Sequence, residues 1–420
     1  MKVLFVHQNF PGQYKHLAAH LAADDRHEVR ALGDLKNIRQ RPKIEGVQLS
    51  GYAVPERRKS DSHPYLREFS GHIRRAKAAA AACERMKKKG FVPDVICVHP
   101  GWGEALFLKD VFPESRLLNF LEFFYHAQGA DTGFDPEFSP GEVDAYRTRI
   151  RNSTLLLSLS AMDWGISPTY WQFRQHPEEY HPRMSVIHDG IDTRLVKPDA
   201  KASFRLPRRG LTFRPGDEVV TYVSRNLEPY RGFHTMMRAL PELLRARPNA
   251  HVVLVGGQGA SYGGKSKSGS YRKQFLEELK GRIDLNRIHF TGRLPYERYI
   301  NLLQVSACHV YLTYPFVLSW SLLEAMSAGC AIVGSDTPPV SEVIRHGENG
   351  LLVDFFSPDA LAAAVDRVLS KPQPLAQVRA RARQTVVEHY DLETICLPRQ
   401  LALIDDLTAG RLRPAVPDVI

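Results

Sequence analysis

The segment 314–329 combines residue types that could bind a phosphorylated ligand carrying hydroxyl groups. It reads YPFVLSWSLLEAMSAG, and the short apolar run at 307–313 before it predicts a buried parallel strand. Apolar residues then recur at helical spacing, so we expect a helix that begins near Ser319 or Ser321. The free N–H groups of such a helix start can bind phosphate at the carboxyl end of a sheet, and Glu324 in the first turns can bind ribose hydroxyls. The alternative is a buried amphipathic helix whose Glu324 merely favours the positive helix end.

Strands and helices alternate along the chain around this segment. In the first half we expect strands at 2–7, 28–32, 47–53, 94–98, 116–121 and 184–187, and helices at 12–23 and 65–89. In the second half we expect strands at 218–224, 251–255, 287–291, 307–313 and 331–334, and helices at 233–244 and 271–279. This order predicts an α/β protein with two Rossmann-like, doubly wound parallel-sheet domains, at 1–196 and 217–391. Proline, glycine and basic residues at 197–216 indicate a linker between them.

Composition is that of an ordinary globular protein. The chain has 420 residues, of which 24% are charged and 43% hydrophobic, and this length favours two domains. Five cysteines lie without paired or metal-type spacing, which is typical of reduced, buried thiols. No apolar run has the length of a membrane span, and Met1 leads directly into a strand without a signal peptide, so we expect a cytoplasmic protein.

The net charge of +10 indicates anionic partners. Basic residues concentrate at 36–89, namely Lys36, Arg39, Arg41, Lys43, Arg57, Arg58, Lys59, Arg67, Arg74, Arg75, Lys77, Arg85, Lys87, Lys88 and Lys89. The helix expected at 65–89 could contact the inner face of an anionic membrane or an anionic acceptor. It could equally be a solvated helix with its cations at the favourable C-terminal end. Nucleic acid is disfavoured as a partner, because no nucleic-acid-binding module accompanies the charge.

Two glycine-rich patterns resemble motifs of other enzyme classes, a P-loop NTPase and an oxidoreductase, but their context disfavours both. Residues 259–266 read GASYGGKS and satisfy the P-loop pattern, but the next helix is expected only from about Tyr271, and no later apolar strand ends in the Asp that would hold magnesium. Residues 256–259 lack the full dinucleotide fingerprint, which disfavours an oxidoreductase. No Asp-x-Asp and no zinc-type spacing occur, so we expect no metal site.

Five further segments complete a pattern with 314–329. They read NFPGQ at 9–13, MSVIHDGID at 184–192, SRNLEPYRG at 224–232, HFTGRL at 289–294, and Glu-x4-Gly-x2-Gly within 342–353. Their order and spacing resemble the retaining GT-B glycosyltransferases of the family 4 type, which build lipopolysaccharides, capsules and glycolipids. The resemblance implies the GT-B architecture, in which the two domains face a cleft and the final helix, here about 392–420, packs back on the first domain.

The resemblance also implies a donor site. In this family an Arg and a Lys neutralise the donor diphosphate, and Arg225 and Arg231 match them. Glu324 matches the second of two glutamates, whereas Phe316 stands in the place of the first. The residues expected to bind the nucleotide sugar are Gly12, Arg225, Arg231, Arg293, Phe316, Ser319, Ser321, Leu322 and Glu324.

Two candidates for the catalytic side follow the strand expected at 116–121. Glu122 and His126 match the place where family members carry a His or an acid near the transferred sugar. Either could hold a sugar hydroxyl or orient the acceptor, or could simply be a hydrogen-bonded polar residue at a strand end.

The implied function is a retaining, metal-independent glycosyltransferase. It would move a hexose from a UDP- or GDP-sugar to a cell-envelope glycan or a lipid-linked acceptor, with the nucleotide sugar as substrate and no cofactor. Because Phe316 cannot accept a hydrogen bond, a second hypothesis is a catalytically reduced GT-B partner subunit that binds a sugar nucleotide or a glycan without transfer. A nucleotide-sugar epimerase would need acid and base carboxylates in the cleft that the sequence does not identify.

Overall fold

The computed structural model describes residues 1–56, 63–139, 144–370 and 372–414, with side chains in the last range from residue 375. The chain forms two compact units. Unit 1 consists of Met1–Gly133, Gly141–Asp189 and Glu393–Ile420, and unit 2 of Phe134–Pro140 and Gly190–Leu392. The basic residues Arg57, Arg58 and Lys59 lie outside the described residues.

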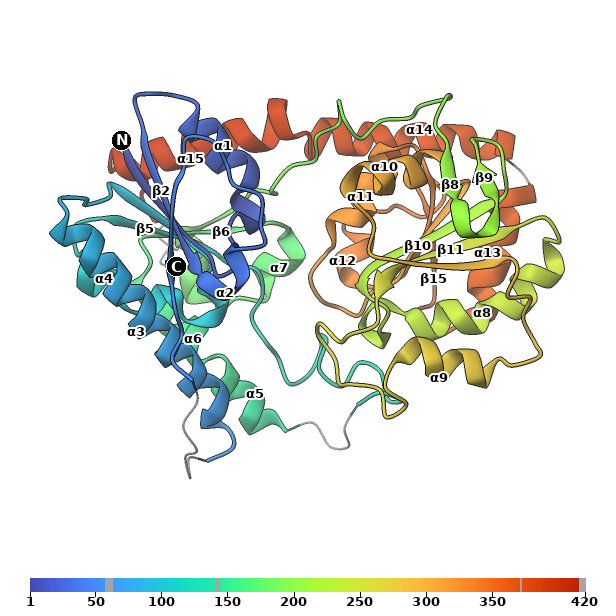
Figure 1. Cartoon of the computed structure of the whole chain (residues 1–420), viewed down its shortest axis with the longest axis horizontal. Helices are drawn as coiled ribbons and strands as arrows, with labels where there is room; N and C mark the ends of the chain where they lie inside the picture. The colour runs from blue at the N-terminus through green and yellow to red at the C-terminus, as the bar shows by residue number, and fades with distance from the viewer. Residues whose placement is uncertain (57–62, 140–143, 371, 415–420) are drawn as a thin grey trace, which may run out of the picture. The chain divides into compact units, whose positions relative to one another are not determined.

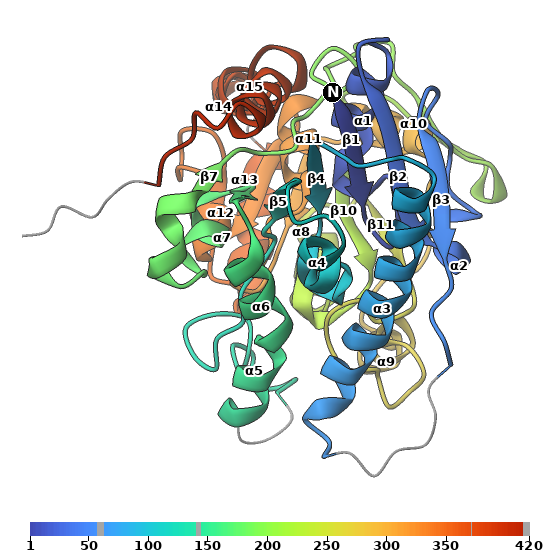
Figure 2. The same cartoon turned by 90° about the vertical axis from the view of Figure 1, so that its left-hand side faces the viewer.

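Unit 1 contains a seven-stranded parallel sheet of order β3-β2-β1-β4-β5-β6-β7 (Figures 1 and 2). Its strands are β1 (Lys2–Val6), β2 (Glu28–Asp34), β3 (Gln48–Tyr52), β4 (Val95–Val98), β5 (Arg116–Phe120), β6 (Trp164–Ser167) and β7 (Met184–Val186). Every strand that follows β3 is added on the other side of β1, so the direction of winding changes between β1 and β4.

Helices cover both faces of this sheet, because successive strand residues point to opposite faces. Val3 and Phe5 pack in one cluster with α1 (Lys15–Ala22) and α15 (Leu397–Thr408), whereas Leu4 and Val6 pack in another with α3 (Leu66–Lys88) and α4 (Leu108–Val111). The other helices of unit 1 are α2 (Leu35–Ile38), α5 (Ala145–Arg151), α6 (Ser153–Ala161) and α7 (Tyr170–Arg174). The final helix α15 thus belongs to the core of unit 1.

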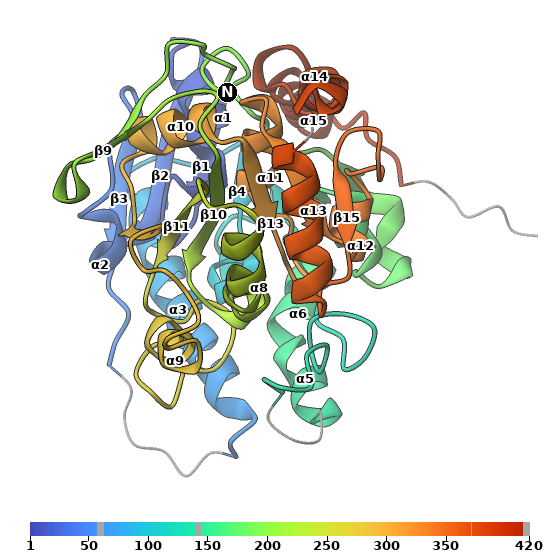
Figure 3. The same cartoon turned by 90° about the vertical axis from the view of Figure 1, so that its right-hand side faces the viewer.

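Unit 2 contains a six-stranded parallel sheet of order β12-β11-β10-β13-β14-β15 (Figure 3). Its strands are β10 (Val219–Asn226), β11 (His251–Gly257), β12 (Ile288–Gly292), β13 (Cys308–Tyr311), β14 (Ala331–Ser335) and β15 (Leu351–Val353). The helices are α8 (Phe233–Ala246), α9 (Tyr271–Glu278), α10 (Tyr296–Val305), α11 (Trp320–Ser327), α12 (Pro338–Ser341), α13 (Pro358–Ser370) and α14 (Pro372–His389). Residues of α10, α11 and α14 share one core cluster, while α8 and α13 pack together elsewhere in the unit.

The predicted fold class, two doubly wound parallel-sheet domains, is confirmed. The sequence analysis missed β6, β15 and an antiparallel hairpin of β8 (Phe204–Leu206) and β9 (Leu211–Phe213) within the segment expected to be a linker. Phe204 and Phe213 are buried in a cluster with Val219 and Val253, so tertiary packing orders this hairpin. Strands of three or four residues are too short to show a periodicity.

The long helix α3 carries much of the basic region. Its Ala76, Ala79 and Cys83 are buried, while Arg67, Lys77 and Lys88 are exposed. Across the part of the chain that the structure describes, no helix combines the length and the apolar character needed to cross a bilayer; α3 has 23 residues but is too polar.

Candidate functional site

The carboxyl ends of neighbouring strands at a winding reversal form the usual ligand site of a doubly wound sheet, because the loops there diverge and leave a crevice. In unit 2 the reversal lies between β10 and β13, and in unit 1 between β1 and β4. The loops after β10 and β13 contain Arg231 and Phe316, and the loops after β1 and β4 contain Gly12 and His99.

Arg231 connects the loops after β10 and β13. Its Nη1 donates hydrogen bonds to the hydroxyl of Tyr311 at 3.2 Å, Oγ1 of Thr313 at 2.8 Å and the carbonyl oxygen of Val317 at 2.9 Å. Only 7% of its surface is exposed. These acceptors are hydroxyl and carbonyl oxygens, so they orient the guanidinium without neutralising its charge.

Tyr262, which the sequence analysis did not single out, lies against both candidate phosphate-binding arginines. The guanidinium carbons of Arg225 and Arg231 are 6.0 and 5.3 Å from the centre of its ring. Its ring centre is 5.1 Å from that of Phe316, which is 5% exposed and also packs edge-on against Tyr230 at 5.5 Å. A phosphate group that contacted both guanidinium groups would therefore compete with this aromatic ring.

The loop that satisfies the P-loop pattern binds a carboxylate of its own chain. Glu228 is fully buried and accepts hydrogen bonds from the backbone N–H groups of Ser261, at 3.1 and 3.0 Å, Tyr262, at 3.2 Å, and Gly263, at 3.3 Å. The helix α9 begins at Tyr271, as the sequence predicted. The amides that would cradle a phosphate in a P-loop thus hold Glu228 instead.

The start of α11 agrees with the sequence prediction. Ser319 is the N-cap, and its side chain accepts a hydrogen bond from the Ser321 N–H at 3.4 Å. The Ser321 hydroxyl lies 3.1 Å from that of Ser319. Leu322 is fully buried in the core, and its N–H donates to the Ser319 carbonyl at 3.2 Å, so its side chain serves packing.

Glu324 accepts hydrogen bonds from two phenols. The hydroxyl of Tyr296 lies 2.8 Å from Oε1, and that of Tyr299 lies 2.8 Å from Oε2. Burial and the Glu324 charge raise the pKa of both tyrosines, so both hydroxyls stay protonated and donate. A carboxylate oxygen can accept more than one hydrogen bond, so this group is of the kind that binds ribose hydroxyls. Both tyrosines lie on α10 three residues apart, on one face of the helix.

Arg293 is exposed at the end of β12. Its Nη2 donates to Oδ1 of Asn226 at 3.5 Å, a long contact that leaves most of the guanidinium available.

In unit 1, position 12 requires a glycine, because the backbone there lies close to the ring of His7. Its φ is +49°, and a Cβ there would lie 2.7 Å from Cε1 and Nε2 of His7. His7 is 3% exposed, and its Nδ1 accepts the N–H of Asn9 at 2.9 Å. The sequence analysis did not identify His7, although its position directly after β1 was a signal for it.

Glu122 belongs to a polar and aromatic group at the ends of β1, β4 and β5. Its Oε2 lies 3.4 Å from Nε2 of His99, and its Oε1 accepts from Nε2 of Gln13 at 3.5 Å. The ring of Trp102 stacks on His99 at 4.2 Å, and His7 lies 5.4 Å from His99, edge to face. This group can hold sugar hydroxyls through one carboxylate and two imidazoles.

His126 has different neighbours. Its Nε2 lies 2.8 Å from the carbonyl oxygen of Gln175, which follows α7. Since a carbonyl only accepts, this nitrogen is the protonated one.

A small cavity in unit 1 is too small for a sugar. It has a volume of about 20 Å³ and is lined by residues that include Tyr14, Asn119 and Asp189. Burial raises the pKa of Tyr14. This volume holds about one water molecule, so we do not assign it to the donor or the acceptor.

No group of three or more potential metal ligands, counting His, Cys, Asp and Glu, occurs among the residues that the structure describes.

Two family descriptions match the chain. Residues 25–196 match the Glycosyl transferase family 4 group, and residues 206–385 match Glycosyl transferases group 1. The D-inositol 3-phosphate glycosyltransferase of Rhodococcus jostii is 28% identical over 202 residues, which cover 48% of this chain and 42% of that protein. The glycogen synthase of Mycobacterium tuberculosis is 28% identical over 213 residues, which cover 50% of this chain and 46% of that protein. The matches thus span less than half the length of these curated relatives.

Solved structures share the fold over nearly the whole chain. Sucrose-phosphate synthase from Thermosynechococcus elongatus has a TM-score of 0.71 at 18% identity, covering 98% of this chain and 100% of that one. Anabaena Alr3699/HepE in complex with UDP has a TM-score of 0.64 at 17% identity, covering 97% and 100%.

Proposed function

Because the chain belongs to the GT-B glycosyltransferases of the family 4 type, we propose that it is a retaining hexosyltransferase. The donor is a UDP- or GDP-sugar, and the acceptor is a cell-envelope glycan or a lipid-linked sugar. The observation that carries this proposal is the arrangement at the winding reversal of unit 2, where Arg231 links the two loops and the start of α11 follows directly.

The diphosphate and the ribose of the donor each have candidate partners. Arg225 and Arg231 bind the diphosphate, because guanidinium groups form strong, charge-assisted hydrogen bonds with phosphate oxygens. The N–H groups at the start of α11 add partial positive charge. Glu324, oriented by Tyr296 and Tyr299, accepts hydrogen bonds from ribose hydroxyls.

Transfer then requires stabilisation of the departing nucleoside diphosphate rather than a protein nucleophile. The two arginines and the helix N-terminus stabilise its developing negative charge. The departing phosphate takes the proton of the acceptor hydroxyl on the same face of the sugar, so the anomeric configuration is retained. Since these groups supply the positive charge that a metal supplies elsewhere, turnover proceeds without a divalent cation.

The exposed cations of α3 favour an interaction with an anionic acceptor or with a membrane surface. Arg67, Lys77, Arg85, Lys88 and Lys89 are exposed. Other cations of this helix are bound within unit 1, since Arg75 donates to the carbonyl of Trp102 at 3.3 Å and Lys87 to that of Val111 at 2.6 Å. The exposed group can attract anionic headgroups on the cytoplasmic face of a membrane, each cation contributing about 1 kcal/mol.

A second candidate function is a partner subunit that binds a sugar nucleotide without transferring the sugar. Phe316 favours it, because this buried side chain has no hydrogen-bond acceptor for a sugar hydroxyl.

A donor panel in EDTA tests the proposal. UDP- and GDP-linked hexoses, beginning with the UDP-glucose found in a solved relative, are incubated with and without crude envelope lipid, and free nucleotide is measured. We expect lipid-dependent release in EDTA, and loss of release in Arg225→Ala but not in the control Arg282→Ala, both arginines being exposed. Nucleotide binding without release from any donor would favour the partner-subunit function. Activity that EDTA abolishes and magnesium or manganese restores would contradict the metal-independent chemistry.

A further inference from the structure

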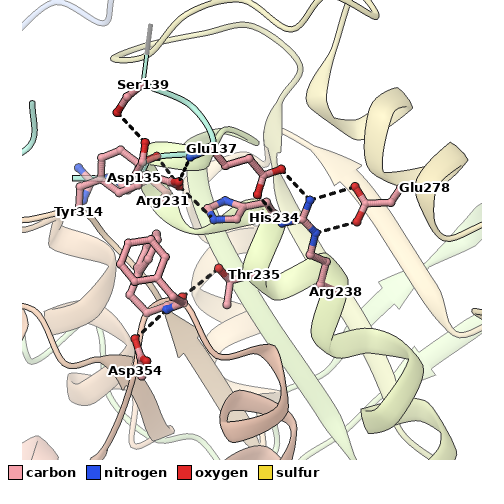
Figure 4. Close-up of polar contacts among 12 residues, drawn as sticks. Asp135, Glu137, Ser139, Arg231, His234, Thr235, Arg238, Glu278, Tyr314 and Asp354 are labelled. Carbon is pink, nitrogen blue, oxygen red and sulfur yellow. Dashed lines mark hydrogen bonds and ion pairs between the residues drawn. The ribbon is translucent and has the colours of Figure 1, made fainter. Parts of the chain in front are cut away.

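A segment from the first half of the chain packs on unit 2. In the chain, residues 134–139 come between two parts of unit 1, after Gly133 and before α5, yet they belong to unit 2. Figure 4 shows Asp135 and Glu137 of this segment beside Tyr314, His234 and Arg238. The ring of Phe134 contacts those of Tyr314, at 5.2 Å between centres, and Phe355, at 5.3 Å. The ring of Phe138 lies 5.0 Å from that of His234. Two aromatic side chains therefore anchor this segment by burying apolar surface.

The exposed edge of the segment forms an ion-pair network. Glu137 accepts two hydrogen bonds from Arg238, at 2.6 and 2.7 Å, and Arg238 also binds Glu278 at 2.6 and 3.1 Å (Figure 4). This network holds the segment on α8 and α9. It does not involve the residues that follow β13.

The buried centre of the segment is Asp135, which is 2% exposed. Its Oδ2 accepts a hydrogen bond from the hydroxyl of Tyr314 at 2.8 Å and lies 3.2 Å from Nε2 of His234. Its Oδ1 accepts the N–H of Glu137 at 3.0 Å. Burial lowers the pKa of His234, so the imidazole is neutral at neutral pH and donates its Nε2–H to Asp135.

The two partners of Asp135 lie beside the two donor-site loops. Tyr314 begins the turn that leads to Phe316, and its N–H donates to the carbonyl of Tyr230 at 3.0 Å. His234 lies in the first turn of α8, three residues after Arg231. One carboxylate thus connects the start of α8 to the turn after β13.

We propose that Asp135 is a positioning residue for the donor site, which holds the 314–316 turn against the Arg231 loop through the hydroxyl of Tyr314. The proposal rests on the proposed function, since it concerns the same donor site. Asp135 itself contacts neither donor nor acceptor in this assignment. It sets where Phe316 and the start of α11 lie relative to the arginines.

Three variants separate positioning from folding. Tyr314→Phe removes the one hydroxyl and keeps the ring contacts with Phe134 and Tyr230. Asp135→Ala removes the carboxylate, and the double variant completes a cycle. Glu137→Gln is the matched control, because it weakens the anchor to Arg238 on the same segment and leaves the Tyr314 contact in place.

The readouts are the affinity for UDP and GDP by calorimetry, the donor KM and kcat, and the melting temperature. We expect Tyr314→Phe to raise the nucleotide Kd and the donor KM about tenfold, the lower end of the effect of losing one hydrogen bond to a charged group. Asp135→Ala should do at least as much, and Tyr314→Phe should add nothing in the Asp135→Ala background. Glu137→Gln should leave both constants within about twofold, as expected for an exposed ion pair.

The outcomes are distinct. If wild type binds nucleotide but Tyr314→Phe lowers only the melting temperature, Asp135 has a structural role and the inference is wrong. Equal losses of affinity in Glu137→Gln and Tyr314→Phe would assign the effect to the segment as a whole and also overturn it. Wild type that binds no nucleotide would overturn the proposed function, and this inference with it.

Discussion

At the scale of single residues, tyrosine hydroxyls hold the charged groups of the candidate donor site. Tyr311 contacts Arg231, Tyr314 contacts Asp135, and Tyr296 and Tyr299 contact Glu324. A neutral hydroxyl satisfies a buried charge by hydrogen bonding but does not cancel it, as an ion pair would. These hydroxyls therefore orient Arg231 and Glu324 in advance without cancelling their charges.

Phe316 should decide which donor sugar is accepted. In the family pattern a glutamate at this place accepts hydrogen bonds from the transferred hexose, whereas Phe316 presents a ring packed between Tyr230 and Tyr262. A sugar hydroxyl buried against this ring would have no hydrogen-bond acceptor there, which would weaken donor binding by about 1 to 3 kcal/mol. We therefore expect a preference for a sugar with fewer hydroxyls, or with an acyl or methyl group there, and a shift toward ordinary hexoses in Phe316→Glu.

Measurement of kcat/KM for glucose, galactose, mannose, N-acetylhexosamine and deoxyhexose donors checks this prediction. Phe316→Leu serves as the control, because it keeps an apolar side chain and should keep the order of preference. An unchanged order in an active Phe316→Glu would show that this side chain does not face the sugar.

At the scale of elements, the loop between β11 and α9 depends on one buried carboxylate. Glu228 accepts the N–H groups of Ser261, Tyr262 and Gly263. Asn226 also donates from Nδ2 to Oγ of Ser261 at 2.6 Å. The loop conformation, and with it the place of the Tyr262 ring over the arginines, is thus set by contacts with the end of β10 and the loop after it.

Glu228→Gln should release this loop. The amide side chain offers one acceptor oxygen and directs an NH₂ group at backbone donors, so the variant loses charge-assisted hydrogen bonds of about 1.5 to 3 kcal/mol each. We expect faster hydrogen exchange at residues 261–263 and a lower melting temperature.

Glu242→Gln is a suitable control, because Glu242 is exposed and pairs only with its neighbour Arg245 in the contacts described for it. Exchange at 261–263 that is equally slow in Glu228→Gln and wild type would mean that the carboxylate does not hold the loop.

At the scale of the whole molecule, buried histidines should make stability depend on pH. Burial lowers the pKa of His176 and His188 in unit 1 to about 4, and that of His309 in unit 2 to about 3, from an ordinary 6.5. Below pH 6.5 the unfolded chain binds protons that these folded imidazoles do not bind. The contribution of these neutral histidines to the free energy of unfolding is therefore fully present above pH 6.5. It falls as the pH drops toward 4, by up to about 1.4 kcal/mol per pH unit for each histidine.

Thermal or urea unfolding between pH 7.5 and 5 measures this dependence. His309→Gln removes one of the titrating groups, so its stability should fall less steeply with decreasing pH than that of wild type. A stability that stays constant or increases between pH 6.5 and 5 would contradict the prediction.

The sequence alone predicted that the chain forms two parallel sheets, although without their strands β6 and β15, and it predicted the start of α11. These features depend on local patterns: apolar runs for buried strands, helical spacing for α8 and α9, and a serine N-cap at Ser319. The family resemblance named Arg231 and Glu324, and the structure places them in the segments that follow β10 and β13, the two strands at the winding reversal.

Only the tertiary structure decided the contacts that hold those residues. Asp135 and Tyr314 lie 179 positions apart, and Glu228 binds amides 33 to 35 positions away. No local periodicity encodes such pairs, since each depends on which loops the sheet order brings together. For the same reason the sequence does not distinguish Asp135, Glu228 and Tyr262 from other polar and aromatic residues in loops. Their roles can be assigned only in the folded structure, where a buried charged group needs hydrogen-bonding partners.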